Sequence, residues 1–313
     1  MTKDPTRERW ALAAILATML VWGMNFAFVK YILGYIGVGA FLFMRFTLLT
    51  LLGFVLLAIA FRGRLRMTWP RREDLPRFVG AGLVGHAFHV GLVMYGMNLS
   101  TAFSSSLVLT SSPLFTLALL AGLGAEPLRR RQVAGTLVAF AGIVLFLSDK
   151  FVRGRAAAGA GDLVLLSAAA LFSLYTVMVR PLAERYGALI VLSYTLLFSA
   201  PLILAFTFVD VREVRFSELG AAVWLGLAWA IVFSSFFGWL MWTWVNTVRG
   251  VARTAPFQYL MPPIAGVVAW LTLGEAFTWL KIAGAGVTMS GVAWAQLGGG
   301  RPPPKEAAQP DAG

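Results

Sequence analysis

The sequence predicts an all-α, polytopic membrane protein with ten transmembrane helices in two inverted five-helix repeats. Hydrophobic residues make up 59% of the 313 positions and charged residues only 13%, which is about half the charge of a soluble domain. Ten apolar runs reach the length of roughly 20 residues that crosses a bilayer. The second half of the chain also repeats several positions of the first half at a fixed spacing.

The apolar runs follow one another closely, and short connections between them hold most of the Gly, Pro and charged residues. The runs cover residues 10–30, 36–61, 75–97, 101–124, 130–148, 161–180, 188–209, 217–246, 251–273 and 279–297. The first run is too long for the core of a typical signal peptide, so we expect an uncleaved helix behind a cytoplasmic tail, residues 1–9. The Pro- and Ala-rich residues 298–313 predict a disordered cytoplasmic tail.

Basic residues predict the orientation of these helices. With a cytoplasmic N-terminus, 18 of the 26 Lys and Arg residues fall on the cytoplasmic side and seven on the other, while Arg45 lies inside a run. Cytoplasmic loops carry an excess of Lys and Arg, so we expect an inner-membrane protein with both termini in the cytoplasm. The loop 149–160 fits least well, because it places three basic residues outside.

The same distribution explains the formal net charge of +12. Basic loop residues orient helices and touch anionic headgroups, so membrane lipid is the expected partner of this charge and nucleic acid is not. The chain has no Cys, which excludes disulfides and Cys-ligated metals.

An internal repeat appears when the chain is shifted by 149 residues. The shift superposes six identical pairs: Pro113 on Pro262, Glu126 on Glu275, Ala134 on Ala283, Gly135 on Gly284, Val138 on Val287 and Gly142 on Gly291. The first run matches the sixth at a shift of 150, with Val29 on Val179 and Lys30 on Arg180. Five runs per half is an odd number, so the halves enter the membrane from opposite sides. Inverted repeats commonly place a binding site near the midplane and give alternating access.

The repeated residues resemble the signature of the EamA domain. The first copy contains Pro113, Gly-Ala-Glu-Pro at 124–127, Gln-Val-Ala-Gly at 132–135 and Gly142, and the second contains Pro262, Gly-Glu at 274–275, Ala-Gly at 283–284 and Gly291. Two such domains in ten helices are the pattern of the drug/metabolite transporter superfamily. The resemblance covers about 10–297 and implies a first EamA repeat at 10–148, the loop 149–160 and a second repeat at 161–297.

Within that superfamily the chain looks like the YddG-type amino-acid exporters, by overall similarity and an aromatic-rich eighth run. This resemblance implies a bacterial inner-membrane protein that moves aromatic and other neutral amino acids outward. It also implies a basket-shaped bundle with a central cavity lined by helices 1, 3, 4, 6, 8 and 9, and helices 5 and 10 at the periphery.

Polar residues inside the runs are candidates for this cavity, because intramembrane polar groups are costly and usually functional. Asn25 and Tyr175 occupy matching positions of the first and sixth runs. His86 and His89 are three residues apart and share a helix face, with His89 the stronger candidate. No third strong ligand lies nearby in the sequence, so no metal is expected.

The fourth and ninth runs carry prolines at the same place of the repeat. Pro113 follows Ser111, and Pro262 follows Gln258 and Tyr259. A proline frees a backbone carbonyl one turn earlier, which could face a polar ligand. We therefore expect Ser111, Pro113, Gln258 and Pro262 at the cavity, with a simple packing kink as the alternative.

The eighth run carries Trp239 and Trp242, which share a helix face with Asn246. An aromatic wall suits an apolar side chain and attracts an ammonium group. We expect both tryptophans at the cavity; the alternative for Trp242 is an aromatic belt at the membrane interface.

Other motif residues predict structural roles. Glu126 and Glu275 are interpreted as residues that lock helix ends to basic or backbone groups, with a role in transport as the alternative. Arg45 lies about 10 Å into its run, at 1.5 Å per residue. A structural ion pair is the preferred interpretation, with Glu275 as one candidate partner, and contact with a substrate carboxylate is the alternative. Gly135 and Gly284 belong to pairs of small residues that allow close helix packing between halves or protomers.

The residues that are missing narrow the function. No Asp or Glu lies at the centre of a run, which disfavours proton-driven export of lipophilic cations, and a single buried Arg disfavours sugar nucleotides or phosphates. The Trp, Ser, His and Asn residues inside the runs fit an exporter of neutral or aromatic amino acids or related metabolites. The alternatives are an exporter of drugs or other small metabolites and, remotely, a membrane-embedded enzyme. We expect no cofactor and no ATP motif, so transport would be ion-coupled or facilitated; ten spans suffice for a pathway in a monomer.

Overall fold

The computed structural model describes residues 5–124, 130–152 and 156–297, and every regular element in these ranges is a helix. Single helices form six of the expected spans: α1 (Pro5–Ile32), α2 (Val38–Ala60), α7 (Arg130–Val152), α8 (Ala156–Tyr186), α9 (Ala188–Arg212) and α14 (Trp279–Leu297).

Four spans are interrupted helices. The third consists of α3 (Leu75–Gly82), the π-helix η2 (Leu83–His89) and α4 (Val90–Leu99), and the eighth of α10 (Ala221–Ala228), the π-helix η4 (Trp229–Phe237) and α11 (Gly238–Arg249). The fourth consists of α5 (Ala102–Leu109) and α6 (Ser112–Leu123), and the ninth of α12 (Val251–Thr254), the 3-10 helix η5 (Ala255–Leu260) and α13 (Met261–Leu273). Short 3-10 turns, η1 (Leu65–Thr68) and η3 (Phe216–Glu218), lie in connections.

Within the described residues, seven helical spans are long and apolar enough to cross a membrane. They are the first four and the sixth to eighth of the ten expected runs. The fifth, ninth and tenth runs are helical as well, as α7, the segment 251–273 and α14. The chain is therefore an all-helical, multi-pass membrane protein.

Two boundaries differ from the expectation. Helix α1 already begins at Pro5 inside the expected tail, because Pro suits the first turn of a helix, and Glu8 in this turn pairs with Arg249 at 2.9 Å. The expected loop 149–160 is helical up to Val152 and again from Ala156, since alanine is the strongest helix former.

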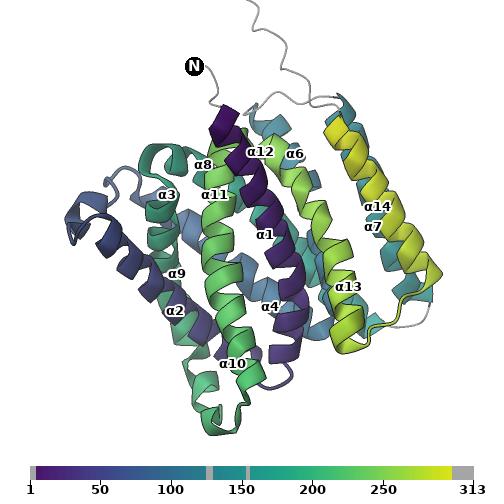
Figure 1. The fold of residues 1–313 in the computed structure, drawn as a ribbon, viewed down its shortest axis with the longest axis horizontal. Helices are drawn as coiled ribbons and strands as arrows, with labels where there is room; N and C mark the ends of the chain where they lie inside the picture. Colours follow the sequence, from purple (N-terminus) through teal and green to yellow (C-terminus); the bar gives the residue numbers. More distant parts are fainter. Residues whose placement is uncertain (1–4, 125–129, 153–155, 298–313) are drawn as a thin grey trace, which may run out of the picture.

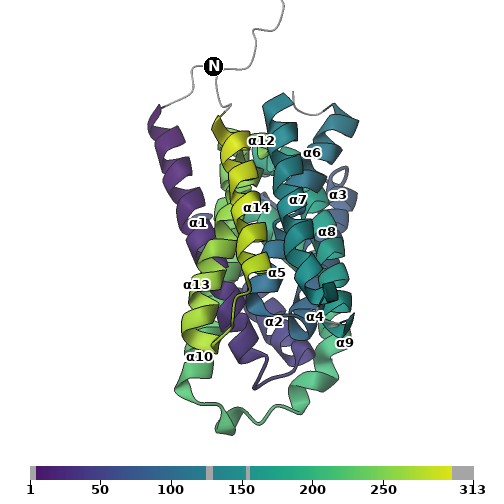
Figure 2. The same ribbon diagram turned by 90° about the vertical axis from the view of Figure 1, so that its right-hand side faces the viewer.

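Each half of the chain packs mainly against the other half. α1 lies against α11 and α13, whereas α8, the counterpart of α1, lies against α4 and α6. α2 packs on its counterpart α9, and α7 packs on its counterpart α14 at one edge of the bundle (Figures 1 and 2). The halves are interleaved rather than separate domains.

The halves also run in opposite directions. Asp74, beside the start of α3, lies 2.7 Å from Arg185 near the end of α8. Glu8, at the start of α1, pairs with Arg249 at the end of α11. Helices of the first half thus begin where helices of the second half end, and α1 begins at the same end of the bundle where α14 ends (Figure 1).

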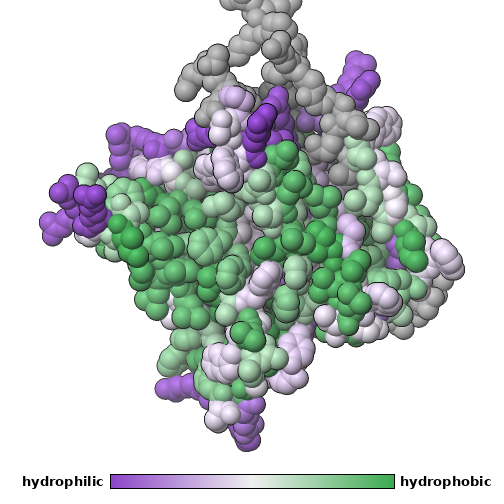
Figure 3. All heavy atoms as spheres, viewed as in Figure 1, coloured by the Kyte–Doolittle hydropathy of each residue, from purple (hydrophilic) through white to green (hydrophobic). Residues whose placement is uncertain are grey.

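The visible surface has the layered polarity of a membrane protein. In Figure 3 hydrophobic residues cover the middle of the face, and hydrophilic residues gather at its two ends. Large apolar side chains such as Leu51, Phe206 and Leu271 are more than half exposed. Exposure of this kind is stable only when lipid rather than water covers it.

Small residues hold α7 and α14 together. A Cβ atom added at Gly284 would lie 2.7 Å from the Phe146 backbone nitrogen and 2.8 Å from the Gly142 carbonyl oxygen. A Cβ atom at Gly291 would collide with the backbone of Ala139, and one at Gly142 with the backbone of Thr288. The absence of side chains at these places lets the two backbones touch, and the contact joins the two halves of one chain.

Candidate functional site

Two interrupted helices meet near the middle of the molecule. In the first half the helix stops at Leu109 and restarts at Ser112, one residue before Pro113. In the second half η5 gives way to α13 at Met261, one residue before Pro262. Proline lacks the N–H that would bond the carbonyl four residues earlier, so the same residue interrupts both helices at the same place of the repeat.

A central cavity lies beside these breaks. Its volume is about 90 Å³, and a cavity needs only about 10–15 Å³ to hold one water, so it has room for a small solute. Both halves line it, through Trp22, Asn25, Phe26, Arg45, His89, Val90, Val93, Met94, Met97, Leu109, Ser112, Phe172, Ser234, Trp239, Gln258 and Met261. The lining follows α4 as far as Met97, toward the end of the bundle opposite the start of α1.

The cavity wall obeys the internal repeat. At a shift of 150 residues Trp22 falls on Phe172 and His89 on Trp239. At a shift of 149 residues Leu109 falls on Gln258 and Ser112 on Met261. All eight residues line the cavity, so each half supplies the same four wall positions with different side chains.

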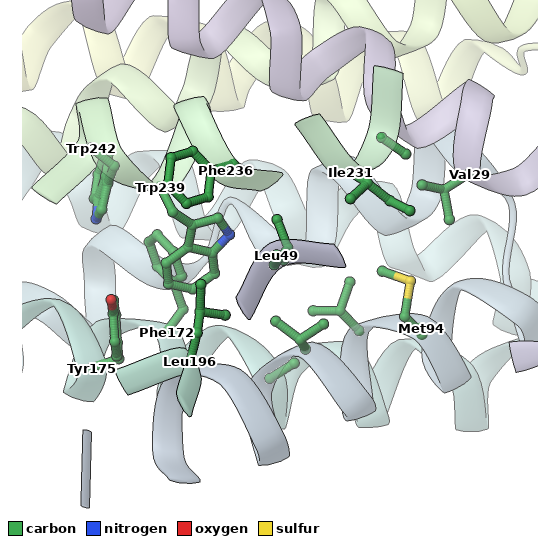
Figure 4. Packing of buried hydrophobic residues seen from close by; sticks show 14 of the residues in the cluster. Val29, Leu49, Met94, Phe172, Tyr175, Leu196, Ile231, Phe236, Trp239 and Trp242 are labelled. Atoms are coloured by element: carbon green, nitrogen blue, oxygen red, sulfur yellow. The ribbon is translucent and has the colours of Figure 1, made fainter. Parts of the chain in front are cut away.

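Aromatic rings form one side of the cavity. The rings of Trp22 and Phe172 lie 6.0 Å apart, and Trp239 lies 6.3 Å from Trp22 and 5.5 Å from Phe172. Figure 4 shows Trp239 beside Phe172, with Trp242 and Tyr175 next to them and Met94 further along the core. Ring pairs at these separations pack favourably, so the wall is rigid and apolar.

Behind this wall the bundle axis is filled. Trp242 packs 5.6 Å from Trp22 and donates its indole N–H to Thr176 at 3.1 Å. Tyr175 lies 4.9 Å from the ring of Trp239, and both Trp242 and Tyr175 are fully buried. The cavity is therefore closed toward the end of the bundle where α1 begins.

Polar groups line the cavity as well, and one of them, His89, packs against the rings of Phe172 and Trp239. His89 Nδ1 lies 2.8 Å from the carbonyl oxygen of Ala168; a carbonyl only accepts, so Nδ1 carries the proton and Nε2 of the neutral ring is left as an acceptor. The Asn25 Oδ1 and Gln258 Nε2 atoms are buried without a hydrogen-bond partner among the described residues. The cavity thus offers both donors and acceptors to a guest.

Arg45 adds a positive charge to this set. Its side chain is only 6% exposed and lines the cavity. It forms no hydrogen bond with the described residues, none of whose carboxylates lies within 4 Å, and its Nε is buried and unpaired. An unpaired buried charge is costly, so a negatively charged group in the cavity would stabilise Arg45.

The structure brings four of the nine candidate cavity residues to the wall: Asn25, His89, Trp239 and Gln258. Tyr175 and Trp242 lie directly behind the wall. Pro113 and Pro262 are each one residue beyond a wall residue, and Ser111 is one residue before Ser112. His86 is turned away from the cavity toward Thr195, at 3.1 Å.

Several wall residues are absent from the sequence-based candidates. Trp22, Phe172, Ser112 and Ser234 line the cavity, and Arg45, interpreted mainly as structural, lines it too. The repeat itself would have indicated Trp22 and Phe172, because the 150-residue shift places one aromatic residue on the other in the same runs that carry Asn25 and Tyr175.

The motif glutamate of the second repeat, Glu275, lies at a helix end. Glu275 accepts the backbone N–H of Ala102 at 2.8 Å and that of Phe103 at 3.4 Å, which satisfies the first turn of α5 and places a negative charge at its N-terminus. It therefore binds backbone groups rather than Arg45. The corresponding Glu126 lies outside the described residues.

Ion pairs tie the two halves together at the closed end. Arg185 on α8 contacts Asp74 at 2.7 Å and Glu73 at 2.9 Å, and the Tyr186 hydroxyl donates to Asp74 at 2.5 Å. Asp74 is buried while the side chain of Arg185 is 40% exposed. This cluster of ion pairs, the Asp74–Arg185 tie, joins two carboxylates of the first half to one arginine of the second half.

Comparison with known proteins gives a family and several relatives. The EamA-like transporter family matches residues 9–148 and 159–296. A "Probable terminal-alkyne amino-acid exporter" of Streptantibioticus cattleyicolor is 29% identical over 90% of this chain and 92% of that protein. A "Probable amino-acid metabolite efflux pump" of Salmonella typhimurium is 26% identical over 88% of this chain and 91% of that protein.

Two further likenesses extend over the same length. An "Uncharacterized transporter" of Archaeoglobus fulgidus is 25% identical over 91% of this chain and 97% of that protein. A solved crystal structure superposes with a TM-score of 0.69 at 21% identity, covering 92% of this chain and 97% of the other. At this identity the structural likeness shows the shared fold.

Proposed function

The chain belongs to the EamA-like transporter family and is therefore a membrane transporter, and from this premise we propose that it exports neutral and aromatic amino acids or closely related metabolites. The observation that carries the proposal is the central cavity, which joins a wall of three aromatic rings to unpaired donors and acceptors. Two relatives whose names include amino-acid export support it.

The cavity suits a zwitterion with an apolar side chain. Trp22, Phe172 and Trp239 offer an apolar surface for the side chain, and an aromatic face also attracts an ammonium group. Described residues of the wall include no carboxylate, so a lipophilic cation would find no counter-charge there. The second candidate function is export of drugs or other metabolites. A cationic drug would not match the charge of this wall, which holds Arg45 and, among its described residues, no carboxylate.

We further propose the inner membrane as the location, with both termini in the cytoplasm. In this orientation the closed end, with the Asp74–Arg185 tie, faces the cytoplasm, and the lining along α4 leads to the outer side. Transport would proceed by alternating access, with the two halves rocking about the cavity.

Reconstitution in liposomes tests the proposal. Counterflow of labelled L-phenylalanine and L-leucine should exceed that of protein-free vesicles, whereas ethidium should not move. The variant Ser112→Trp should stop the flux, because it fills the cavity from the α6 break. The matched control Leu123→Trp places the same ring on the same helix at a side chain that is 64% exposed, and it should transport normally. Flux of ethidium without flux of either amino acid would favour a drug exporter and contradict the proposal.

A further inference from the structure

Arg45 is the charged residue of the cavity wall, and the fold does not explain its presence. At the 150-residue shift that superposes the starts of α2 and α9, Arg45 falls on Thr195. Thr195 fills the equivalent place with a small hydroxyl that bonds its own helix and His86. A neutral residue therefore suffices at this position of the scaffold, and the guanidinium needs another reason.

The surroundings of Arg45 lack the partner that a buried cation requires. Its Nε atom is buried and unpaired, no hydrogen bond joins the guanidinium to the described residues, and no described carboxylate lies within 4 Å. Glu275, the carboxylate expected from the sequence, is bound to the backbone of Ala102 and Phe103 instead. The guanidinium borders the cavity, so a guest in the cavity can reach it.

We propose that Arg45 binds the carboxylate of the transported solute and makes that carboxylate the feature by which the transporter selects its substrates; this inference rests on the proposed function. A guanidinium presents several N–H donors in one plane and pairs with a carboxylate through two parallel hydrogen bonds. Because the side chain of Arg45 is only 6% exposed, solvent competes less for such a pair than it does at a protein surface.

The other polar groups of the wall complete the recognition of an amino acid. Gln258 Nε2 is a second unpaired donor, suited to the same carboxylate. His89 Nε2 and Asn25 Oδ1 are acceptors, suited to the ammonium group. The donor set and the acceptor set match the two ends of a zwitterion, and the rings take the side chain.

Binding to the purified full-length protein in detergent, followed by tryptophan fluorescence, tests the role of Arg45 independently of flux. The probes share one ring and differ in charged groups: L-phenylalanine, 3-phenylpropionate, phenethylamine and L-phenylalanine methyl ester. The wild type should bind the two carboxylates at least tenfold more tightly than the two compounds without a carboxylate. Arg45→Gln should weaken the binding of the two carboxylates at least tenfold and leave the affinity for the other two probes unchanged. Arg45→Lys keeps the charge but loses the planar donors, so its affinity for the carboxylates should lie between those of the wild type and Arg45→Gln.

The control Arg249→Gln removes an arginine that pairs with Glu8 and does not line the cavity, and it should keep the wild-type order of affinities. Equal binding of all four probes by the wild type, or unchanged carboxylate binding in Arg45→Gln, would overturn the assignment of Arg45. A changed thermal unfolding midpoint with an unchanged order of probes would show a structural role alone. These outcomes can be told apart from those of the flux assay. Carboxylate binding without amino-acid flux would contradict the proposed export function but would support the binding role of Arg45.

Discussion

The contact between α7 and α14 and the wall of the central cavity use the same internal repeat in opposite ways. At the contact, matching positions carry identical small residues: Gly135 matches Gly284, and Gly142 matches Gly291. At the cavity, matching positions diverge: His89 matches Trp239, and Leu109 matches Gln258. Symmetry is kept where two backbones must touch and is lost where a solute has to be recognised.

This difference separates two physical demands. A backbone contact is satisfied in the same way by both partners, because neither can carry a side chain there. A solute such as an amino acid is not symmetric, since one end is anionic and the other cationic. A cavity with identical halves would offer each end the same groups, so the two halves must differ to orient the solute.

The largest effect is expected from breaking the symmetric region. Gly284→Leu would drive a side chain into the backbone of α7, 2.7 Å from Phe146 N, and overpacking typically costs about 1–3 kcal/mol and occasionally more. We expect little folded protein by fluorescence-detected size-exclusion chromatography. Gly286→Leu on the same helix is the control, since no atom of the described residues lies within 4 Å of a Cβ there; comparable yields of the two variants would show that the contact tolerates side chains.

Making the cavity more symmetric should reduce transport without unfolding the protein. Gln258→Leu gives the second half the residue of the first and removes an unpaired donor from the wall. A hydrogen bond to a charged group contributes about 1.5–3 kcal/mol, so counterflow of L-phenylalanine should fall at least tenfold. Gln132→Leu removes an amide from α7, which does not line the cavity, and a similar loss in both variants would argue against a role of Gln258 in the cavity.

The aromatic wall should determine which amino-acid substrates are preferred, rather than the transport rate of all substrates alike. Trp239→Leu removes a ring that lies 4.8 Å from His86 and 5.5 Å from Phe172. Aromatic pairs contribute about 0.5–1.5 kcal/mol, so the preference for L-phenylalanine over L-leucine should drop about fivefold in competition assays. Trp270→Leu changes a ring that is 59% exposed and should keep the preference; an unaltered preference in Trp239→Leu would contradict the assignment of this wall.

The smallest effect is expected where the symmetric region is already slightly asymmetric. Thr288 matches Ala139 at the shift of 149, and its hydroxyl donates to Gly284 O at 2.8 Å and to Ala139 O at 3.3 Å. Thr288→Ala restores identity and should change the free energy of unfolding by less than about 1 kcal/mol. Thr272→Ala, which removes a similar bond on the exposed face of α13, provides the reference for thermal unfolding in detergent. A loss of several kcal/mol would mean that this hydroxyl holds the two halves together.

The sequence predicts the fold well because bilayer thickness fixes the length of each apolar run. All ten runs are helical in the described residues, and the prolines at 113 and 262 mark the two interruptions beside the cavity. The π-helical segments η2 and η4 were not predicted, because a single extra residue per turn leaves no mark in hydrophobic periodicity.

The site was predictable only in part. Asn25, His89 and Gln258 stand out because polar residues are rare in apolar runs. Trp22 and Phe172 do not stand out by residue type, since aromatic residues are common throughout this chain. Their match at the 150-residue shift was the one sequence signal for them, and packing shows that both face inward. The ion pair expected between Arg45 and Glu275 does not form, because Glu275 accepts a backbone N–H at the N-terminus of α5 instead. Sequence spacing does not reveal that this helix end lies beside Glu275.

The packing of α1 against α11 and α13 has a consequence for synthesis. Helix α1 finds its main partners in residues 238–273, more than 200 positions later in the chain. At about 5–20 residues per second, translation takes on the order of 10 to 50 s to supply them. During that interval the main partners of α1 are missing, and only its smaller contacts can form, such as those with α5 and the bonds of Lys30 to the carbonyl oxygens of Met97 and Asn98.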